Sequence, residues 1–209
     1  MKSVIFLFGI AGALLFIIAS ILGGLQIEGY SFVSQFISES YANGIPNTEY
    51  LRHMYMVCGF LLALFGFMVP QVVQPAKYLT VSFYLFAIFY GIGTISTGFF
   101  PCDLGCPSNP EKSSISQIIH NASGFLVYAI VPFCLLGIGV FSKKWKRRSK
   151  FSKVSIICGT TAFCFVVLLF GNPKGPFVGL FQRLIEGSIL FWVMYTAFFI
   201  RTIKNKIDE

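Results

Sequence analysis

Five ionisable residues stand where apolar segments of the chain begin or end: Glu39, Asp103, His120, Arg183 and Glu186. A carboxylate or an imidazole can exchange protons with a substrate, and a guanidinium can bind an anionic group through two parallel hydrogen bonds. Such groups are costly when they are buried alone, so we expect them to meet at one end of the molecule. What they could do there depends on the elements that carry them.

Short polar motifs surround these residues. The segments "SQFISESYANG", "GFFPCDLGC", "SISQIIHNASG" and "GLFQRLIEGS" each join a polar cluster to an apolar run. Arg183 and Glu186 stand three residues apart, which makes them neighbours on a helix surface. The candidate ligand-binding residues are Ser34, Gln35, Ser38, Glu39, Arg52, Asp103, His120, Asn121, Gln182, Arg183 and Glu186.

The composition places the chain in a membrane. Of its 209 residues, 56% are hydrophobic and only 11% are charged, and the mean hydropathy is +0.76. Soluble domains carry about 25% charged residues, so we interpret the chain as an integral membrane protein whose first partners are membrane lipids. The net charge of +8 does not indicate nucleic-acid binding, because the basic residues gather in short loops between apolar runs.

Six segments are long and apolar enough to cross the hydrocarbon core, which needs roughly 20 residues of helix. We therefore predict an all-α fold with one six-helix transmembrane domain covering residues 1–209. We interpret the first segment as a retained helix, because it is longer than the apolar part of a signal peptide. The predicted spans are residues 4–25, 54–70, 78–98, 118–141, 154–170 and 181–200.

The distribution of basic residues predicts the orientation. With six spans, both termini lie on one side, and twelve of the 16 Lys and Arg residues fall on that side. The largest group is the run at residues 143–153, "KKWKRRSKFSK". Cytoplasmic loops are enriched in Lys and Arg, so both termini are predicted to be cytoplasmic. The polar motifs then belong to the external side.

The first external connection contains an unusual polar stretch, "YSFVSQFISESYANG", at residues 30–44. Its apolar residues Phe32, Val33, Phe36 and Ile37 recur with helical spacing, and polar residues fall on the other face. We predict a short amphipathic helix that lies across the external mouth of the bundle. Its polar face, with Glu39, would point towards the other ionisable groups.

Two of the six cysteines, Cys102 and Cys106, lie in an external loop around Asp103. External compartments are oxidising, so a disulfide between them is expected. A metal site is the alternative, although the spacing differs from that of common zinc sites. Cys58, Cys134, Cys158 and Cys164 lie in apolar spans and are interpreted as small hydrophobic residues.

Three classes of function remain open. We favour the binding or movement of a lipid headgroup or small amphiphile, with Arg183 facing an anionic group. A structural role in assembly is next, because a polar network can serve only to lock helices. The third is a membrane-embedded hydrolase or transferase with Glu39 or Asp103 as general base and His120 as acid–base partner, or with all three holding a metal ion. We expect no cofactor, and two histidines exclude a histidine-rich metal centre.

The motifs resemble, over nearly the whole chain and in the same order, those of a prokaryotic membrane family catalogued as domain of unknown function 998. The resemblance implies a six-helix fold in a prokaryotic cell membrane and brings no established activity. In place of the family's usual Leu-Gly after the first motif, this chain has Ser40-Tyr41. The matching positions are Ser34, Ile37, Ser38 and Glu39; Phe100, Pro101 and Asp103; His120; and Gln182 and Arg183.

The charge distribution makes a direct prediction about topology. A reporter or a cysteine label placed at Ser149, within the largest basic run, should be accessible only from the cytoplasm. The measurement is labelling of intact cells with a membrane-impermeant reagent. Labelling from outside would contradict the six-span arrangement with cytoplasmic termini.

Overall fold

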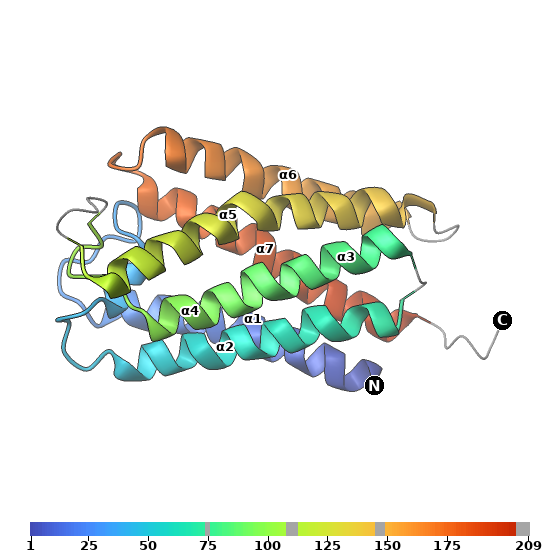
Figure 1. Ribbon diagram of the computed structural model, residues 1–209, viewed down its shortest axis with the longest axis horizontal. Helices are drawn as coiled ribbons and strands as arrows, with labels where there is room; N and C mark the ends of the chain where they lie inside the picture. Colours follow the sequence, from blue (N-terminus) through green and yellow to red (C-terminus); the bar gives the residue numbers. More distant parts are fainter. Residues whose placement is uncertain (74–75, 108–112, 145–148, 204–209) are drawn as a thin grey trace.

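The structure is a computed structural model that describes residues 1–73, 76–107, 113–144 and 149–203 (Figure 1). These residues form helices and connecting loops, and they contain no strand. The helices are α1 (Lys2–Leu25), α2 (Glu49–Met68), α3 (Lys77–Phe86), α4 (Gly93–Phe99), α5 (Ile115–Phe141), α6 (Ser149–Gly171) and α7 (Val178–Thr202). Short 3-10 helices are η1 (Ile37–Tyr41), η2 (Val69–Gln71) and η5 (Ser142–Lys144), and η3 (Ala87–Ile92) is a π-helix.

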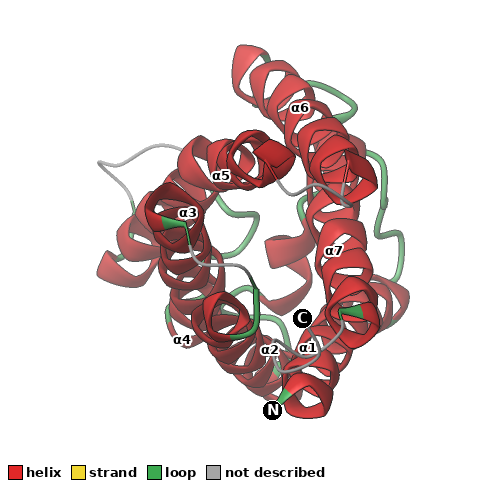
Figure 2. Cartoon of the chain, turned by 90° about the vertical axis from the view of Figure 1, so that its right-hand side faces the viewer, coloured by secondary structure: helices red, strands yellow, loops and turns green. Residues whose placement is uncertain are grey.

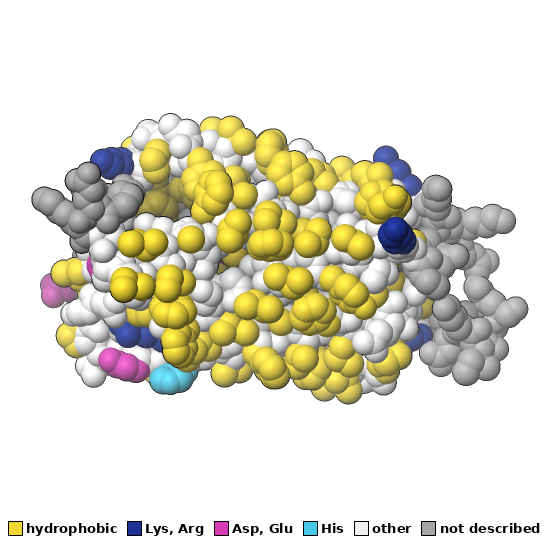
Figure 3. Space-filling model, in the orientation of Figure 1, with side chains coloured by type: hydrophobic (Ala, Val, Ile, Leu, Met, Phe, Trp, Pro, Cys, Tyr) yellow, Lys and Arg dark blue, Asp and Glu magenta, His cyan; other side chains and the backbone are white. Residues whose placement is uncertain are grey.

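Six helical spans of the described chain are long and apolar enough to cross a membrane. Each coincides with one predicted segment, and α3, η3 and α4 together form the third. Apolar side chains cover the middle of the molecule, and charged side chains gather towards its ends (Figure 3). The all-α fold and its six spans confirm the sequence prediction, and the chain is a multi-pass integral membrane protein.

Four helices begin three or more residues before the predicted spans. Helix α2 begins at Glu49, α5 at Ile115, α6 at Ser149 and α7 at Val178, whereas the predicted spans began at 54, 118, 154 and 181. The first turns of these helices contain polar residues. A prediction based on continuous apolar sequence therefore leaves them out, although their backbone is helical. At α5 the side chain of Ser114 caps the helix by accepting a hydrogen bond from the Gln117 N–H, at 3.1 Å.

The helices pack in a ring that follows chain order. Helix α1 packs on α2, α2 on η3 and α4, α3 and α4 on α5, α5 on α6, α6 on α7, and α7 closes the ring on α1 (Figure 2). The backbones of α2 and η3 lie especially close, since a Cβ added at Gly59 would lie 2.5 Å from the Gly91 carbonyl oxygen. Glycine at such crossings lets membrane helices approach without a side chain between them.

The N-terminus and the end of α7 lie at one end of the bundle, and the loop residues 26–48, 100–107, 113–114 and 172–177 lie at the other (Figure 1). We call the second the loop end. This arrangement agrees with an even number of spans, whereas the cytoplasmic location of the termini stays a prediction. Residues 145–148 and 204–209, which carry part of the basic charge used for that prediction, lie outside the described residues.

The first loop does not form the predicted amphipathic α-helix. Residues 32–35 form turns, and only Ile37–Tyr41 is helical, as the 3-10 helix η1. Side-chain hydrogen bonds to the backbone replace the helical pattern. The Ser31 N–H donates to Gln35 Oε1 at 2.8 Å, and the Phe36 N–H donates to Glu39 Oε1 at 2.7 Å.

Arg183 of α7 fastens this loop to the bundle. Its Nη1 donates to the carbonyl oxygens of Phe32 and Gln35, both at 2.9 Å, and to Gly179 of its own helix at 3.0 Å. Its Nη2 donates to the Tyr30 hydroxyl at 2.7 Å, which in turn donates to the Phe36 carbonyl oxygen at 2.7 Å. Burial raises the pKa of the Tyr30 phenol, which keeps its donor proton.

The loop and α7 also meet through their backbones. The Leu180 N–H donates to the Val33 carbonyl oxygen at 2.8 Å. A Cβ added at Gly179 would collide with the Gln35 carbonyl oxygen, so only glycine allows this approach. The Arg183 guanidinium also lies over the Phe32 ring, 4.9 Å from its centroid, which adds a cation–π contact.

The second loop is held by Asp103 and a cysteine pair. Cys102 and Cys106 lie at disulfide distance, as predicted, with Cα atoms 5.1 Å apart. Asp103 accepts hydrogen bonds from the Ser114 N–H at 2.8 Å and the Ser114 hydroxyl at 2.7 Å. These bonds, the backbone one first, hold the pKa of the Asp103 carboxyl below its usual value. Asp103 therefore serves as an ionised clamp at the start of α5.

We predict that Arg183→Ala lowers the free energy of unfolding by about 3 kcal/mol, because it leaves loop carbonyls without their charged donor. Lys174→Ala, which removes an exposed cation at the same end of the molecule, should change it by less than about 0.5 kcal/mol. The measurement is a denaturant titration of the protein in detergent micelles. Equal effects of the two substitutions would show that Arg183 does not anchor the loop.

Candidate functional site

Two adjoining cavities lie at the loop end of the bundle. The inner cavity has a volume of about 70 Å³ and the outer one about 590 Å³. Their common wall is formed by residues that line both: Ser38, His120, Gly124, Tyr128 and Gln182. A Cβ added at Gly124 would meet no atom within 4 Å, so this part of the wall is open.

Glu186 is the central group of the inner cavity. Its side chain is only 6% exposed. The Tyr90 hydroxyl donates to Oε2 at 2.7 Å, and the Tyr128 hydroxyl donates to Oε1 at 2.8 Å. Glu186 lies in the third turn of α7, below the first turns where sequence placed the polar groups. It is therefore an intramembrane carboxyl, a type of group that commonly marks a functional site.

A directional chain of hydrogen bonds ends at Glu186. The Ile37 N–H of η1 donates to Gln182 Oε1 at 2.7 Å. Gln182 Nε2 donates to the Tyr128 hydroxyl at 3.0 Å, and Tyr128 then donates to Glu186. Because every donor points the same way, each bond polarises the next, and the chain directs positive potential at the carboxyl group.

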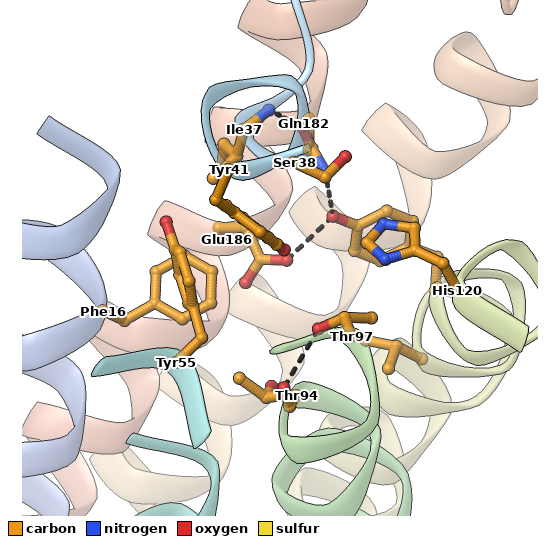
Figure 4. Close-up of a pocket in the computed structure, with 13 residues that line it drawn as sticks. Phe16, Ile37, Ser38, Tyr41, Tyr55, Thr94, Thr97, His120, Gln182 and Glu186 are labelled. Carbon is orange, nitrogen blue, oxygen red and sulfur yellow. Dashed lines mark hydrogen bonds between the residues drawn. The ribbon is translucent and has the colours of Figure 1, made fainter. Parts of the chain in front are cut away.

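Aromatic rings form one wall of the inner cavity. Phe16, Tyr41 and Tyr55 lie on one side of Glu186, and His120 lies on the other (Figure 4). The Tyr41 and Tyr55 ring centroids are 4.7 Å apart, and those of Phe16 and Tyr55 are 5.2 Å apart. The Tyr55 side chain is 1% exposed, yet its hydroxyl has no hydrogen-bond partner among the residues that the structure describes. A buried polar atom without a partner is rare and calls for an occupant of the cavity.

His120 stands between the two cavities on α5. Its Nδ1 lies 2.9 Å from the Phe100 carbonyl oxygen. A carbonyl can only accept, so Nδ1 carries the proton of this bond, which orients the ring. His120, Gly124 and Tyr128 are spaced by four residues and thus share one face of α5.

The outer cavity is lined by both polar and apolar residues. The polar ones include Glu39, Asn121 and Lys174. The apolar ones include Phe125 and Phe170, whose ring centroids are 5.6 Å apart. These two rings are 57% and 43% exposed, so they border the cavity and also belong to the apolar surface of the bundle.

The structure brings together many of the predicted binding residues but not all of them. Those that line a cavity are Ser34, Ser38, Glu39, His120, Asn121, Gln182 and Glu186. Those that line neither are Gln35, Arg52, Asp103 and Arg183. The second group is occupied by loop contacts. Arg52, for example, donates to the carbonyl oxygens of Tyr41 and Ala42, both at 3.1 Å, and so holds the end of η1.

Arg183 does not pair with a carboxylate as expected. In the described part of the chain, its hydrogen-bond acceptors are three carbonyl oxygens and the Tyr30 hydroxyl. Glu186, three residues further on, points instead to Tyr90 and Tyr128 in the interior. Loop carbonyls can satisfy a guanidinium as a carboxylate would, and sequence spacing alone does not distinguish the two.

Sequence reasoning missed the aromatic part of the site. Tyr90 lies in the π-helix η3, an irregular turn of a kind frequent at functional sites. Tyr41, Tyr55 and Tyr128 occupy mainly apolar surroundings, where a tyrosine hydroxyl usually needs a partner. This requirement could have indicated the site from the sequence, since several tyrosines in apolar spans imply a polar group that bonds their hydroxyls. Further polar cavity residues that were not predicted are Thr94 and Thr97 of α4 and Lys174, in the loop before α7.

The described residues contain no group of three or more His, Cys, Asp or Glu side chains that could hold a metal ion. Glu39 and His120 both line the outer cavity, whereas Asp103 remains bound to Ser114. The three candidates for acid–base chemistry therefore do not share one cavity.

Comparison with known proteins shows the family and nothing beyond it. A family model described as "Protein of unknown function (DUF998)" matches residues 10–198. No curated protein and no solved structure matches the chain. Since the match covers most of the sequence, as its motifs suggested, this multi-pass membrane protein belongs to the DUF998 family.

Proposed function

We propose that the protein binds, or moves, a small amphiphile or lipid headgroup through the two cavities at the loop end. The observation that carries this proposal is a small cavity built around the Glu186 carboxyl group that adjoins a larger cavity bordered by exposed rings, the two sharing a wall that is open at Gly124. A molecule with a polar head and an apolar chain matches that division. Pockets with a few converging polar groups among apolar walls are typical ligand sites.

The apolar border supports entry from the membrane. Phe125 and Phe170 belong both to the outer cavity and to the apolar surface. The alkyl chain of an amphiphile lying against these rings would stay in contact with lipid while the head of the amphiphile reached the polar residues of the outer cavity. With the orientation predicted from the basic residues, the cavities would open at the external leaflet of a prokaryotic cell membrane.

The other two functions receive less support. A network that only locks helices leaves no polar group without a partner at a cavity, whereas the Tyr55 hydroxyl lines the inner cavity and has no partner among the described residues. A hydrolase built on Asp103, His120 and Glu39 needs the three side chains together, and Asp103 lines neither cavity. Binding is therefore the function that fits the cavities best.

The test uses two glycines at which an added Cβ atom would meet nothing within 4 Å. Gly124→Leu puts a branched side chain into the wall between the cavities, and the matched control Gly187→Leu puts it on α7 away from both. The ligands are decanol, decanoate, decyltrimethylammonium and decylphosphocholine, titrated calorimetrically into protein in dodecyl maltoside micelles. We expect saturable binding of at least one, weakened about tenfold or more by Gly124→Leu, a loss of about 1.4 kcal/mol, and unchanged by Gly187→Leu.

Two outcomes contradict the proposal. One is that none of the four compounds binds saturably to the unmodified protein. The other is that Gly124→Leu and Gly187→Leu have equal effects, which would place any binding on the general apolar surface.

A further inference from the structure

We infer that the inner cavity recognises a positively charged ammonium group carried by the amphiphile. This inference rests on the proposed function and specifies its ligand. It differs from the expectation that Arg183 meets an anionic group, because Arg183 is directed at loop carbonyls and lines neither cavity. The sign of the ligand's charge must instead follow from the groups that do face the cavity.

The charge facing the inner cavity is acidic. Glu186 lines it, and of the described Lys and Arg residues none does. Each Glu186 oxygen accepts one hydrogen bond from a neutral phenol, and a carboxylate can accept about four in all. The carboxyl group thus has acceptor capacity left, and no described Lys or Arg side chain lines the cavity to balance its charge. A buried carboxylate in this position is stabilised by a cation that comes from outside the chain.

The aromatic wall favours an organic cation over a metal ion. Phe16, Tyr41 and Tyr55 present rings from α1, η1 and α2 beside Glu186 (Figure 4). The negative face of an aromatic ring attracts ammonium groups, and several rings around one space form the usual cage for methylated ammonium. A metal ion would need several hard oxygen or nitrogen ligands, and no group of acidic residues, His or Cys suited to one occurs in the described chain.

The Tyr55 hydroxyl is an independent indication of a ligand. It is buried, lines the cavity and has no hydrogen-bond partner in the described part of the chain. An N–H of an ammonium group, or a water molecule brought with it, would satisfy the free acceptor of this hydroxyl. The Tyr55 ring contributes to the cation site at the same time.

The size of the cavity limits the group that enters. Its volume of about 70 Å³ is less than half of the roughly 150 Å³ that accommodates benzene in an engineered apolar cavity. Only a compact part of a head group enters, such as an ammonium nitrogen with part of its methyl groups, and the rest of the head, with any phosphate or sugar attached to it, would remain in the outer cavity across the wall that is open at Gly124. There Lys174 could face an anionic group of a zwitterionic lipid.

The first test compares charges on one alkyl chain with the unmodified protein. Decyltrimethylammonium should bind about tenfold or more tightly than decanol, and decanoate should bind more weakly than decanol. Decanol or decanoate binding that is blocked by Gly124→Leu, with no preference for decyltrimethylammonium, would overturn the ammonium assignment and leave the proposed function standing. Absence of binding by every compound would overturn both.

The second test removes the charge. Glu186→Gln keeps the size of the side chain and should weaken decyltrimethylammonium binding about tenfold or more while leaving decanol binding within twofold. Retained decanol binding shows that the variant is folded. An unchanged affinity for decyltrimethylammonium would contradict a role for Glu186. If the variant does not fold, the comparison of charges on the unmodified protein still decides the question.

The same titrations identify the source of the ammonium group. Tighter, Glu186-dependent binding of decylphosphocholine than of decyltrimethylammonium supports a phospholipid headgroup, with its phosphate in the outer cavity. The reverse order supports a simple cationic amphiphile. Displacement of either compound by millimolar sodium chloride but not by tetramethylammonium chloride would contradict recognition of an organic cation.

Discussion

The guanidinium of Arg183 holds the first loop against α7, and both cavities depend on this attachment. Its N–H groups donate hydrogen bonds to the carbonyl oxygens of Phe32 and Gln35. These two residues lie outside any helix, and among the described residues their carbonyl groups have no backbone partner. The attachment positions η1, from which the Ile37 N–H and the Ser38 side chain reach the bundle. Without it, the cavities would lose one wall, because η1 supplies residues that line both of them.

The acidic groups of the loop end fall into two kinds according to the donors around them. Asp103 and Glu39 accept hydrogen bonds from nearby backbone N–H groups, so each stabilises a turn. Glu186 accepts only from phenols on distant helices and lies at the surface of a cavity. The hydrogen bonds of Asp103 and Glu39 stay within their own loops, whereas the Glu186 carboxyl group has acceptor capacity left that faces the inner cavity. Only the second has a chemical reason to attract a ligand.

The fold was largely accessible from sequence, because apolar length determines where a helix can cross a membrane. The site was accessible only in part. His120 and Gln182 were predicted from their polarity at helix ends, and Ser38 from the polar face predicted for the first loop; all three line the cavities. The partners of Arg183 and Glu186 were not predictable, because they depend on which way a side chain turns between two helices. The loop conformation was also missed, since side-chain bonds from Gln35 and Glu39 override its helical periodicity.

The position of Tyr90 links the packing of the bundle to the chemistry of the site. A π-helix has roughly one residue more per turn than an α-helix, so the side chains within it point in different directions from those of a regular α-helix. Tyr90 lies in such a turn and reaches Glu186 across the bundle. The turn is held against α2, where a Cβ added at Gly91 would lie 2.6 Å from the Ala63 Cα. A side chain at Gly91 would push η3 away from α2 and withdraw the Tyr90 donor, so the close crossing of two apolar helices determines how the buried carboxyl group is satisfied.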